Sequence, residues 1–361
     1  MKIKKKLFHG TSLEIPYLKF KKKKLGVISF YILLVLYLSI PFEGFIAPYG
    51  PNTKFKSKSY QPPHRIQLLH NDELIGPFVY EYEMVNPYFK KYMANKNVIH
   101  KLGFFVKGEP YNLLFFIPTD IHLFGIVDGS PFYLLGADRL GRDLFSRIIY
   151  GAKISLTIGF FGALLSLSIG ILLGGFSGYI GGMTDWFIMR TCETVILLPT
   201  FYLFLFLRAI MPTDISPALK FFYIMMILSV PGAFGGARYI RNWVLSLKNT
   251  DYVIAAKIGG ISSLKIILKH IIPQIRNLII LNIMLGIPGF VLGETGLSFL
   301  NLGITEPSVS WGMLMNSAMD INILIQYPWI LFPAMAIIFT VFCFFIFGYA
   351  VKDALDPKAE V

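Results

Sequence analysis

The chain has 361 residues, of which 55% are hydrophobic and only 15% are charged. A mean hydropathy of +0.60 excludes an ordinary water-soluble globular protein of this length. The net charge of +13 would suit nucleic acid, but nine of the 34 Lys and Arg residues precede the first apolar run, where basic residues orient membrane proteins. We therefore expect an all-α polytopic membrane protein with a lipid environment and no nucleic-acid partner.

Apolar runs long enough to cross about 30 Å of hydrocarbon recur along the chain. They begin near Leu25, Ile154, Trp186, Phe221, Ile279 and Trp329. The pattern predicts about six transmembrane helices. The two cysteines, Cys192 and Cys343, lie in separate runs, so no disulfide framework is expected.

Basic residues predict the orientation of these spans. Residues 1–24 are rich in lysine and are expected to be cytoplasmic, and residues 25–46 are expected to form the first transmembrane helix as an uncleaved signal anchor. Residues 238–276 hold seven Lys or Arg, whereas residues 296–328 hold none, which predicts a cytoplasmic and an external loop. An even number of crossings returns residues 352–361 to the cytoplasm.

Residues 47–134 form an insertion that is expected to be external and β-containing. Phe78–Met84 alternates aromatic and acidic residues, and Phe104–Phe116 is interpreted as two strands about a turn at Gly108 and Pro110. Two roles stay open for this cap. It either packs on the rest of the chain as a lid or contacts cargo or an external binding protein.

The expected cytoplasmic loop has the pattern of a helix, a turn and a second helix. Ala255 and Ala256 permit close approach on a short helix, Gly260 ends that helix, Ser262 can cap the next one, and Pro273 lies where a membrane helix starts. This pattern predicts a compact knob that docks into a groove on a partner. The alternative is an amphipathic loop at the membrane surface.

Charged residues cluster before the second apolar run. The residues concerned are Asp138, Arg139, Arg142, Asp143 and Arg147, and their spacing predicts ion pairs along an interfacial helix. Structural anchoring is favoured over a role with cargo.

Ionisable residues inside apolar runs are candidates for function, because a charge at the bilayer centre costs roughly 3 kcal/mol or more. Arg190 and Glu193 are three residues apart and are expected to pair on one helix face, while Glu294 either faces a wet pathway or caps the segment after it. Gly170, Gly174 and Gly178 form a ridge of small residues that predicts close helix packing.

Several blocks resemble the permease subunits of ABC importers, in the branch that serves oligopeptides, dipeptides and nickel. The matching blocks are Leu135–Leu156, Gly178–Asp185, the Ala255-Ala256, Gly260 and Pro273 spacing, Glu294–Gly303, Ser310–Gly312 and Lys352–Pro357. The resemblance implies a permease domain over residues 135–351, with the insertion longer than is usual. The sequence departs from the family pattern at Ile254, where Glu is usual, at Asn301, where Gly is common, and at Tyr349, where Asp is common.

The resemblance assigns roles to particular residues. In the family the loop at residues 238–275 couples the permease to its ATPase. The residues carried over to it are Asp251, Tyr252, Ala255, Ala256, Lys257, Gly260, Ser262, His270 and Pro273. The family signature covers Asp138, Gly141, Arg142, Asp143, Ser146 and Arg147. Glu294 and Arg190 are candidate pathway residues for a different reason, because they are ionisable residues inside apolar runs.

The resemblance also implies the partners: a second permease subunit as a heterodimer, two ATPase subunits that use ATP and Mg²⁺, and an external substrate-binding protein. No Gly-Lys dipeptide occurs, so the phosphate-binding loop of ATPases is absent from this chain. The histidines lack metal-ligand spacing, so we expect no metal, no cofactor and no catalytic residue here. The expected cargo is a peptide, with nickel or an oligosaccharide as alternatives.

Two other classes of protein are alternatives to a permease subunit: a self-sufficient carrier or channel, and an interaction scaffold. A self-sufficient carrier or channel should show inverted repeats or paired charges at mid-membrane, and no convincing repeat is present. An interaction scaffold would use its spans only as an anchor, and six spans with a docking knob exceed that need.

Overall fold

The structure is a computed structural model that describes residues 14–71, 73–212 and 215–356. Its contacts divide the chain into two compact units. Unit 1 comprises Met1–Leu33, Thr157–Glu294 and Thr340–Val361, and unit 2 comprises Leu34–Leu156 and Thr295–Phe339. Lys2, Lys4, Lys5 and Lys6, on which the orientation prediction partly rests, lie outside the described residues.

Five helical stretches in the described residues are long and apolar enough to span a membrane. They are Lys24–Ile46, Leu144–Ile180, Pro217–Leu247, Ser263–Phe299 and Pro328–Leu355. A sixth candidate is the pair α5 (Gly182–Leu197) and α6 (Thr200–Ile210), which is bent by 99°. Pro199 causes the break, because the residue before a proline favours extended backbone and Leu198 adopts it. The prediction of a polytopic helical membrane protein is confirmed, with five continuous candidate spans and one bent pair of helices.

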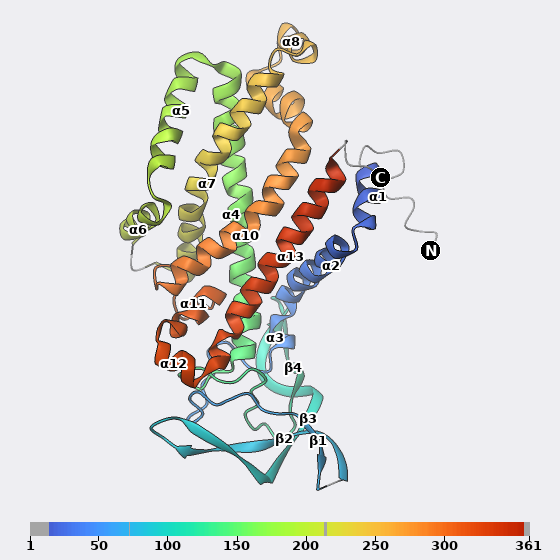
Figure 1. Cartoon of the computed structure of the whole chain (residues 1–361), viewed down its shortest axis with the longest axis vertical. Coiled ribbons are helices and arrows are strands. Elements are labelled where there is room, and N and C mark those ends of the chain that lie inside the picture. The colour runs from blue at the N-terminus through green and yellow to red at the C-terminus, as the bar shows by residue number, and fades with distance from the viewer. Residues whose placement is uncertain (1–13, 72, 213–214, 357–361) are drawn as a thin grey trace. The chain divides into compact units, whose positions relative to one another are not determined.

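The described residues of unit 1 form helices joined by short connections, without a strand among them (Figure 1). Its complete elements are α1 (Glu14–Lys22), α5, α6, α7 (Pro217–Leu247), α8 (Asp251–Ile258), α9 (Ser263–Ile266), η3 (Ile267–Ile271) and η4 (Ile272–Ile275). It also holds parts of α2 (Lys24–Ser39), α4 (Leu144–Ile180), α10 (Arg276–Phe299) and α13 (Phe332–Leu355). Cys192 and Cys343 are free, as expected.

The glycine ridge of α4 packs against the backbone of α7. A Cβ atom on Gly174 would lie 2.3 Å from the carbonyl oxygen of Ala237, and one on Gly178 would lie 2.9 Å from that of Arg241. Contacts this short leave no room for any side chain on the ridge. The prediction of close helix packing is therefore confirmed, and the contact fixes α7 at the point where the chain enters the basic loop.

Unit 2 contains the only sheet among the described residues, a four-stranded antiparallel sheet in the order β1-β2-β3-β4. Its strands are β1 (Gln67–His70), β2 (Glu73–Asn86), β3 (Lys91–Leu113) and β4 (Ile117–Ile126). Its helical elements are η2 (Ile40–Phe42), α3 (Glu43–Ile46), α11 (Trp311–Met315), η5 (Asn316–Met319), α12 (Ile321–Gln326) and η6 (Pro328–Leu331). The predicted strand at Phe78–Met84 lies within β2, which confirms the β-containing insertion.

The predicted turn at Gly108 and Pro110 is wrong. Both residues lie inside β3, at a shift of register between Lys107 and Tyr111, and the chain reverses only after Leu113. Proline has no N–H to donate to a ladder, so a bulge accommodates it within a strand. A Cβ atom on Gly108 would lie 2.6 Å from the ring of His122, so the glycine serves close packing rather than a turn.

The Ser310–Gly312 block fixes the first turns of α4. Trp311 is 2% exposed; its indole Nε1 donates to the carbonyl of Ile148 at 2.9 Å, and its backbone N donates to Ser155 Oγ at 3.1 Å. Ser310 Oγ accepts from the backbone N of Met313 and so caps α11. These contacts hold the loop before Trp311 beside the charged cluster described below.

Candidate functional site

The basic loop of unit 1 folds into a knob, residues 251–273, built on the short helix α8. Val253 and Ala256 of α8 are buried, and they pack with the buried residues Ile240, Val244, Ile266, Ile271 and Ile275. Apolar burial at two positions three residues apart fixes one face of a helix that is too short to be stable alone. Figure 1 shows α8 projecting beyond the ends of α7 and α10.

Gly260 ends α8 in a Schellman motif. Its φ of +75° is in the left-handed region that favours glycine. The N–H of Ile261 donates to the carbonyl of Ala256 at 3.2 Å, and the N–H of Gly260 donates to that of Lys257 at 3.1 Å. The sequence prediction that Gly260 terminates the helix is confirmed, and the turn is stiff because two hydrogen bonds close it.

The outward side of the knob is apolar. Its exposed hydrophobic residues are Tyr252, Ile254, Ile258, Ile261, Leu264 and Leu268. Ile258 is 83% exposed, Ala255 is exposed beside it, and Asp251, Lys257 and Lys265 surround the apolar surface. Exposed apolar patches with a charged rim are typical of protein interfaces. Of the two predicted alanines, Ala256 faces the chain's own core and only Ala255 faces outward.

The remaining predicted residues of the loop lie on its return path. Ser262 occupies the N-cap position of α9, but its side chain makes no capping hydrogen bond, so that part of the prediction is wrong. The extended backbone at Ser262 and the bond from the N–H of Ile266 to its carbonyl start the helix instead. His270 is half-buried in η3, and Pro273 is exposed in η4, directly before α10.

An ion pair ties the base of the knob to α5. Arg241 of α7 donates from Nε and Nη2 to the two carboxylate oxygens of Asp185, each at 2.5 Å. Ser177 Oγ also donates to Asp185. Bidentate Arg–carboxylate pairs fix orientation as well as distance. The three residues therefore hold α4, α5 and α7 together where the loop begins.

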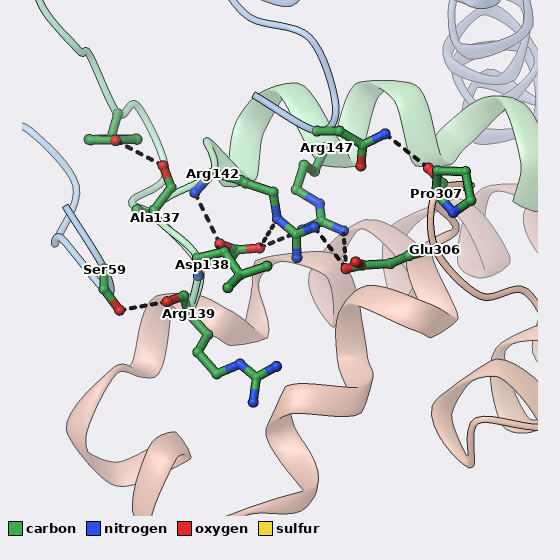
Figure 2. Close-up of polar contacts among 12 residues, drawn as sticks. Ser59, Ala137, Asp138, Arg139, Arg142, Arg147, Glu306 and Pro307 are labelled. Atoms are coloured by element: carbon green, nitrogen blue, oxygen red, sulfur yellow. Dashed lines mark hydrogen bonds and ion pairs between the residues drawn. The ribbon is translucent and has the colours of Figure 1, made fainter. Parts of the chain in front are cut away.

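A second cluster lies in unit 2 and carries the family signature (Figure 2). Asp138 accepts hydrogen bonds from Arg142 Nε at 2.7 Å and from Arg147 Nη1. Arg142 Nη1 also pairs with Glu306 at 2.7 Å, whereas Arg147 Nη2 lies 3.6 Å from Glu306, too far for a hydrogen bond. Burial raises the pKa of the Glu306 carboxyl, but the hydrogen bond and charge of Arg142 outweigh it and the pKa is lowered.

The expected pairing along an interfacial helix is only partly correct. Asp138, Arg142 and Arg147 do pair, but α4 begins at Leu144, so only Arg147 lies on a helix. The pairing is buried, with the Arg147 side chain 1% exposed. Arg139 points away from the cluster in Figure 2, and its backbone carbonyl accepts from Ser59 Oγ at 2.6 Å.

The other signature residues shape the turn that precedes α4. Asp143 accepts from the backbone N and Oγ of Ser146, at 2.7 and 2.6 Å, and so caps the helix. Burial raises the pKa of Asp143 to about 7, against the lowering effect of these bonds. Gly141 has a φ of +72°, and a Cβ atom there would lie 2.4 Å from the carbonyl oxygen of Phe55.

The charged cluster lines a cavity of about 540 Å³ within unit 2. Further polar residues line it as well: Tyr60, Arg139, Asn301, Thr305, Asn316, Ser317 and Asp320. Asn301 has a φ of +61°, a conformation that asparagine tolerates better than other non-glycine residues. This explains physically how it replaces the glycine that is common in the family.

Sequence reasoning missed Glu306, Arg241 and Asp185 as partners in these clusters. Glu306 is one of two acidic residues in the segment 296–328, which contains no basic residue, and this isolation was the signal in the sequence. Arg190 pairs with Glu193 at 2.9 Å, as expected, and their side chains are 64% and 40% exposed. Glu294 is fully buried in unit 1, and its role as a pathway residue stays a prediction.

The fold and these sites define the chain as a multi-pass helical membrane protein with an exposed knob between two spans. Residues 170–361 match the family of binding-protein-dependent transport system inner membrane components, and residues 17–63 match the N-terminal transmembrane domain of oligopeptide transport permease C. The chain therefore belongs to the binding-protein-dependent permease family, and it is a multi-pass inner-membrane component of an ABC transport system.

Three curated relatives have sequences similar to this chain. The oligopeptide transport system permease protein OppC of Haemophilus influenzae is 39% identical over 231 residues, which cover 63% of this chain and 71% of the relative. The dipeptide transport system permease protein DppC of Bacillus subtilis is 39% identical over 230 residues, 63% of this chain and 70% of the relative. The glutathione transport system permease protein GsiD of Pectobacterium atrosepticum is 36% identical over 231 residues, 64% and 74% respectively.

Proposed function

We propose that this chain is one of two permease subunits that form the pathway of an ATP-driven peptide importer, and that its knob docks a separate ATPase subunit. The observation that carries the proposal is the two-sided character of α8. One face is anchored in the core through Val253 and Ala256, and the other is apolar and exposed around Ile258. An exposed apolar surface on a firmly anchored helix is suited to bind an ATPase subunit and to receive its movement.

Peptides are the proposed cargo class because the relatives' names refer to oligopeptides, dipeptides and glutathione. An external binding protein would deliver the peptide, and a sibling permease would supply the other half of the pathway. This chain would line part of the pathway and would transmit the motion of the ATPase subunits to its membrane spans. ATP and Mg²⁺ would be bound by the ATPase subunits, so no catalytic group is assigned to this chain.

The proposed coupling uses alternating access. Closure of the ATPase subunits on ATP would displace α8, and the displacement would pass to α7 through the buried contacts of Val253 and Ala256 with Ile240 and Val244. The bidentate pair between Arg241 and Asp185 would carry it on to α5. Each contact is a rigid link, because buried packing and paired charges resist shear.

The test compares two substitutions at Gly260. Space around this residue is open, with no atom within 4 Å of an added Cβ, but the φ of +75° strains any other residue. Gly260→Asn keeps the turn at low cost because asparagine tolerates this conformation, whereas Gly260→Arg adds bulk on the docking side. We expect Gly260→Arg to lose ATPase co-purification and peptide uptake, while Gly260→Asn keeps both.

Both variants are reconstituted with the sibling permease, the ATPase subunits and the binding protein, and insertion is checked by the amount of chain in the membrane. Normal uptake and normal ATPase recovery by Gly260→Arg would contradict the docking role. Uptake that follows an ion gradient and continues without ATP would favour a self-sufficient carrier.

A further inference from the structure

The hairpin between β3 and β4 ends in exposed aromatic residues. Phe115 is 57% exposed and Phe116 is 74% exposed, and Ile117 follows them at the start of β4 with 42% exposure. We name these three residues the hairpin tip. A water-exposed hairpin end is usually built from polar residues and glycine, so three apolar side chains in a row need a partner.

The backbone conformation of the turn also indicates that the apolar residues of the hairpin tip have a binding partner. Leu114 and Phe115 have φ values of 52° and 73°, in the left-handed region that glycine and asparagine occupy without strain. Bulky residues in this conformation are uncommon and costly. Apolar side chains are thus held at the tip despite a backbone that disfavours them.

The hairpin is attached to the end of the first span. The N–H of Leu114 donates to the carbonyl of Pro41 at 3.1 Å, and Pro41 lies inside the candidate span Lys24–Ile46. Gly44 of α3 lets the hairpin approach, since a Cβ atom there would lie 2.3 Å from the ring of Tyr111. The tip therefore lies beside apolar helical residues rather than away from them.

The tip also contacts the second span. Lys153 Nζ lies 4.8 Å from the centre of the Phe115 ring, and it pairs with Glu43 at 2.8 Å. Lys153 is nine residues into the candidate span Leu144–Ile180, about 14 Å along the helix at 1.5 Å per residue. A Lys–Glu pair beside aromatic rings is typical of the headgroup level, where charges stay hydrated and rings find apolar surroundings.

We propose that the hairpin tip inserts into the outer leaflet of the membrane at the boundary of headgroups and acyl chains, so that the insertion is a lipid-contacting element of this subunit. Phospholipids are the chosen occupant because the tip is continuous with two apolar spans. The depth is limited, since an open strand edge does not enter the hydrocarbon core. At the tip the N–H of Leu114 is bonded to Pro41 and that of Phe116 to Leu113, which permits interfacial burial.

The experiment places spin labels on single cysteines in the full chain, with Cys192→Ala and Cys343→Ala removing the native thiols. The labelled variants are Phe115→Cys, Phe116→Cys and Ile117→Cys, and the control is Tyr88→Cys, which is 94% exposed in the turn between β2 and β3. Each is assembled with its partner subunits in vesicles of phosphatidylethanolamine and phosphatidylglycerol. Relaxation enhancement is measured with oxygen, which concentrates in lipid, and with a water-soluble nickel chelate.

We expect labels at the hairpin tip to respond more to oxygen than to the nickel chelate, and the label at Tyr88 to show the reverse order. A nickel response at the tip equal to that at Tyr88 would show that the tip lies in water and would overturn the proposal. Insensitivity to both agents would show that a protein partner covers the tip, which also overturns it. Ile117→Cys gives the same readout if a phenylalanine variant fails to insert.

Discussion

Asp138 is the residue on which the charged cluster of unit 2 depends. It accepts from Arg142 and Arg147, and its Oδ1 also accepts from the backbone N of Leu140 at 2.8 Å. Buried ion pairs add little net stability when intact, but removing one partner leaves a charge without compensation. We therefore infer that the main role of the cluster is to hold the turn before α4 in place.

Neutralising Asp138 should destabilise the protein markedly. In Asp138→Asn the two arginines would face only Glu306, and we expect a loss of about 3 kcal/mol in the free energy of unfolding. The measurement is the midpoint of thermal denaturation in detergent. The matched control is Arg139→Gln, an exposed neighbour whose side chain points away from the cluster, with an expected change within about 0.5 kcal/mol. Equal midpoints for both variants would show that the cluster has no structural role.

His64 makes the stability of unit 2 depend on pH. Burial lowers the pKa of His64 from 6.5 to about 4, and its Nδ1 accepts from the backbone N of Tyr133 at 2.9 Å. A lowered pKa means that the unfolded chain binds the proton more tightly, so this contribution is complete above the unfolded pKa and falls as the pH drops toward the folded pKa. Between about pH 7 and about pH 5 the loss amounts to about 2 kcal/mol.

The His64 contribution is isolated by comparison with His64→Gln, which does not titrate and keeps an acceptor. We expect the stability difference between the native chain and this variant to shrink by about 2 kcal/mol from about pH 7 to about pH 5. Asp143, whose pKa shifts in the opposite direction, is present in both chains and cancels. A difference that is constant with pH would refute the buried neutral histidine.

At the level of elements, the glycine ridge of α4 lies directly against the backbone of α7. Gly174 and Gly178 bring α4 into contact with Ala237 and Arg241 of α7. Arg241 in turn donates a hydrogen bond to Asp185 of α5, so the three helices are joined at this point. Helix contacts of this kind are stabilised by van der Waals packing, which is the main attraction available between helices in lipid. They are correspondingly intolerant of added volume.

The contact predicts opposite outcomes for two glycine substitutions. Gly174→Ala would place Cβ 2.3 Å from the carbonyl of Ala237, so we expect about 1–3 kcal/mol of destabilisation. Gly235→Ala on α7 meets no atom within 4 Å and should be neutral or stabilising by up to about 1 kcal/mol, because alanine favours helix. Thermal denaturation in detergent compares the two. The same loss in both variants would mean that the ridge is not a packing surface.

For the whole molecule, the basic loops predict that the knob faces the cytoplasm and the β-sheet faces outward. We expect Tyr88→Cys to react with a membrane-impermeant maleimide in intact spheroplasts. Ile258→Cys on the knob, in cells that lack the ATPase subunits, should react only after permeabilisation. Both positions are more than four-fifths exposed, so access rather than burial decides the result. Labelling of Ile258→Cys in intact spheroplasts would reverse the proposed orientation.

The sequence by itself determined the class of protein, the number of candidate spans, the turn at Gly260 and the glycine ridge. These follow from local rules: a bilayer sets the length of an apolar run, and a left-handed turn or a close helix contact requires glycine. The family blocks added the positions of the loop and the signature residues. All of this information is contained in short stretches of the chain.

Only the tertiary structure decided which residues meet across long separations. Glu306 joins Arg142 and Arg147, Asp185 joins Arg241, and Pro110 lies in a bulge instead of a turn. Ion pairs form between segments that packing brings together, and no periodicity in either segment encodes the partner. The bend at Pro199 is an intermediate case, because proline marks the break in the sequence, whereas the angle of 99° is seen only in the structure, where α5 and α6 both contact α7.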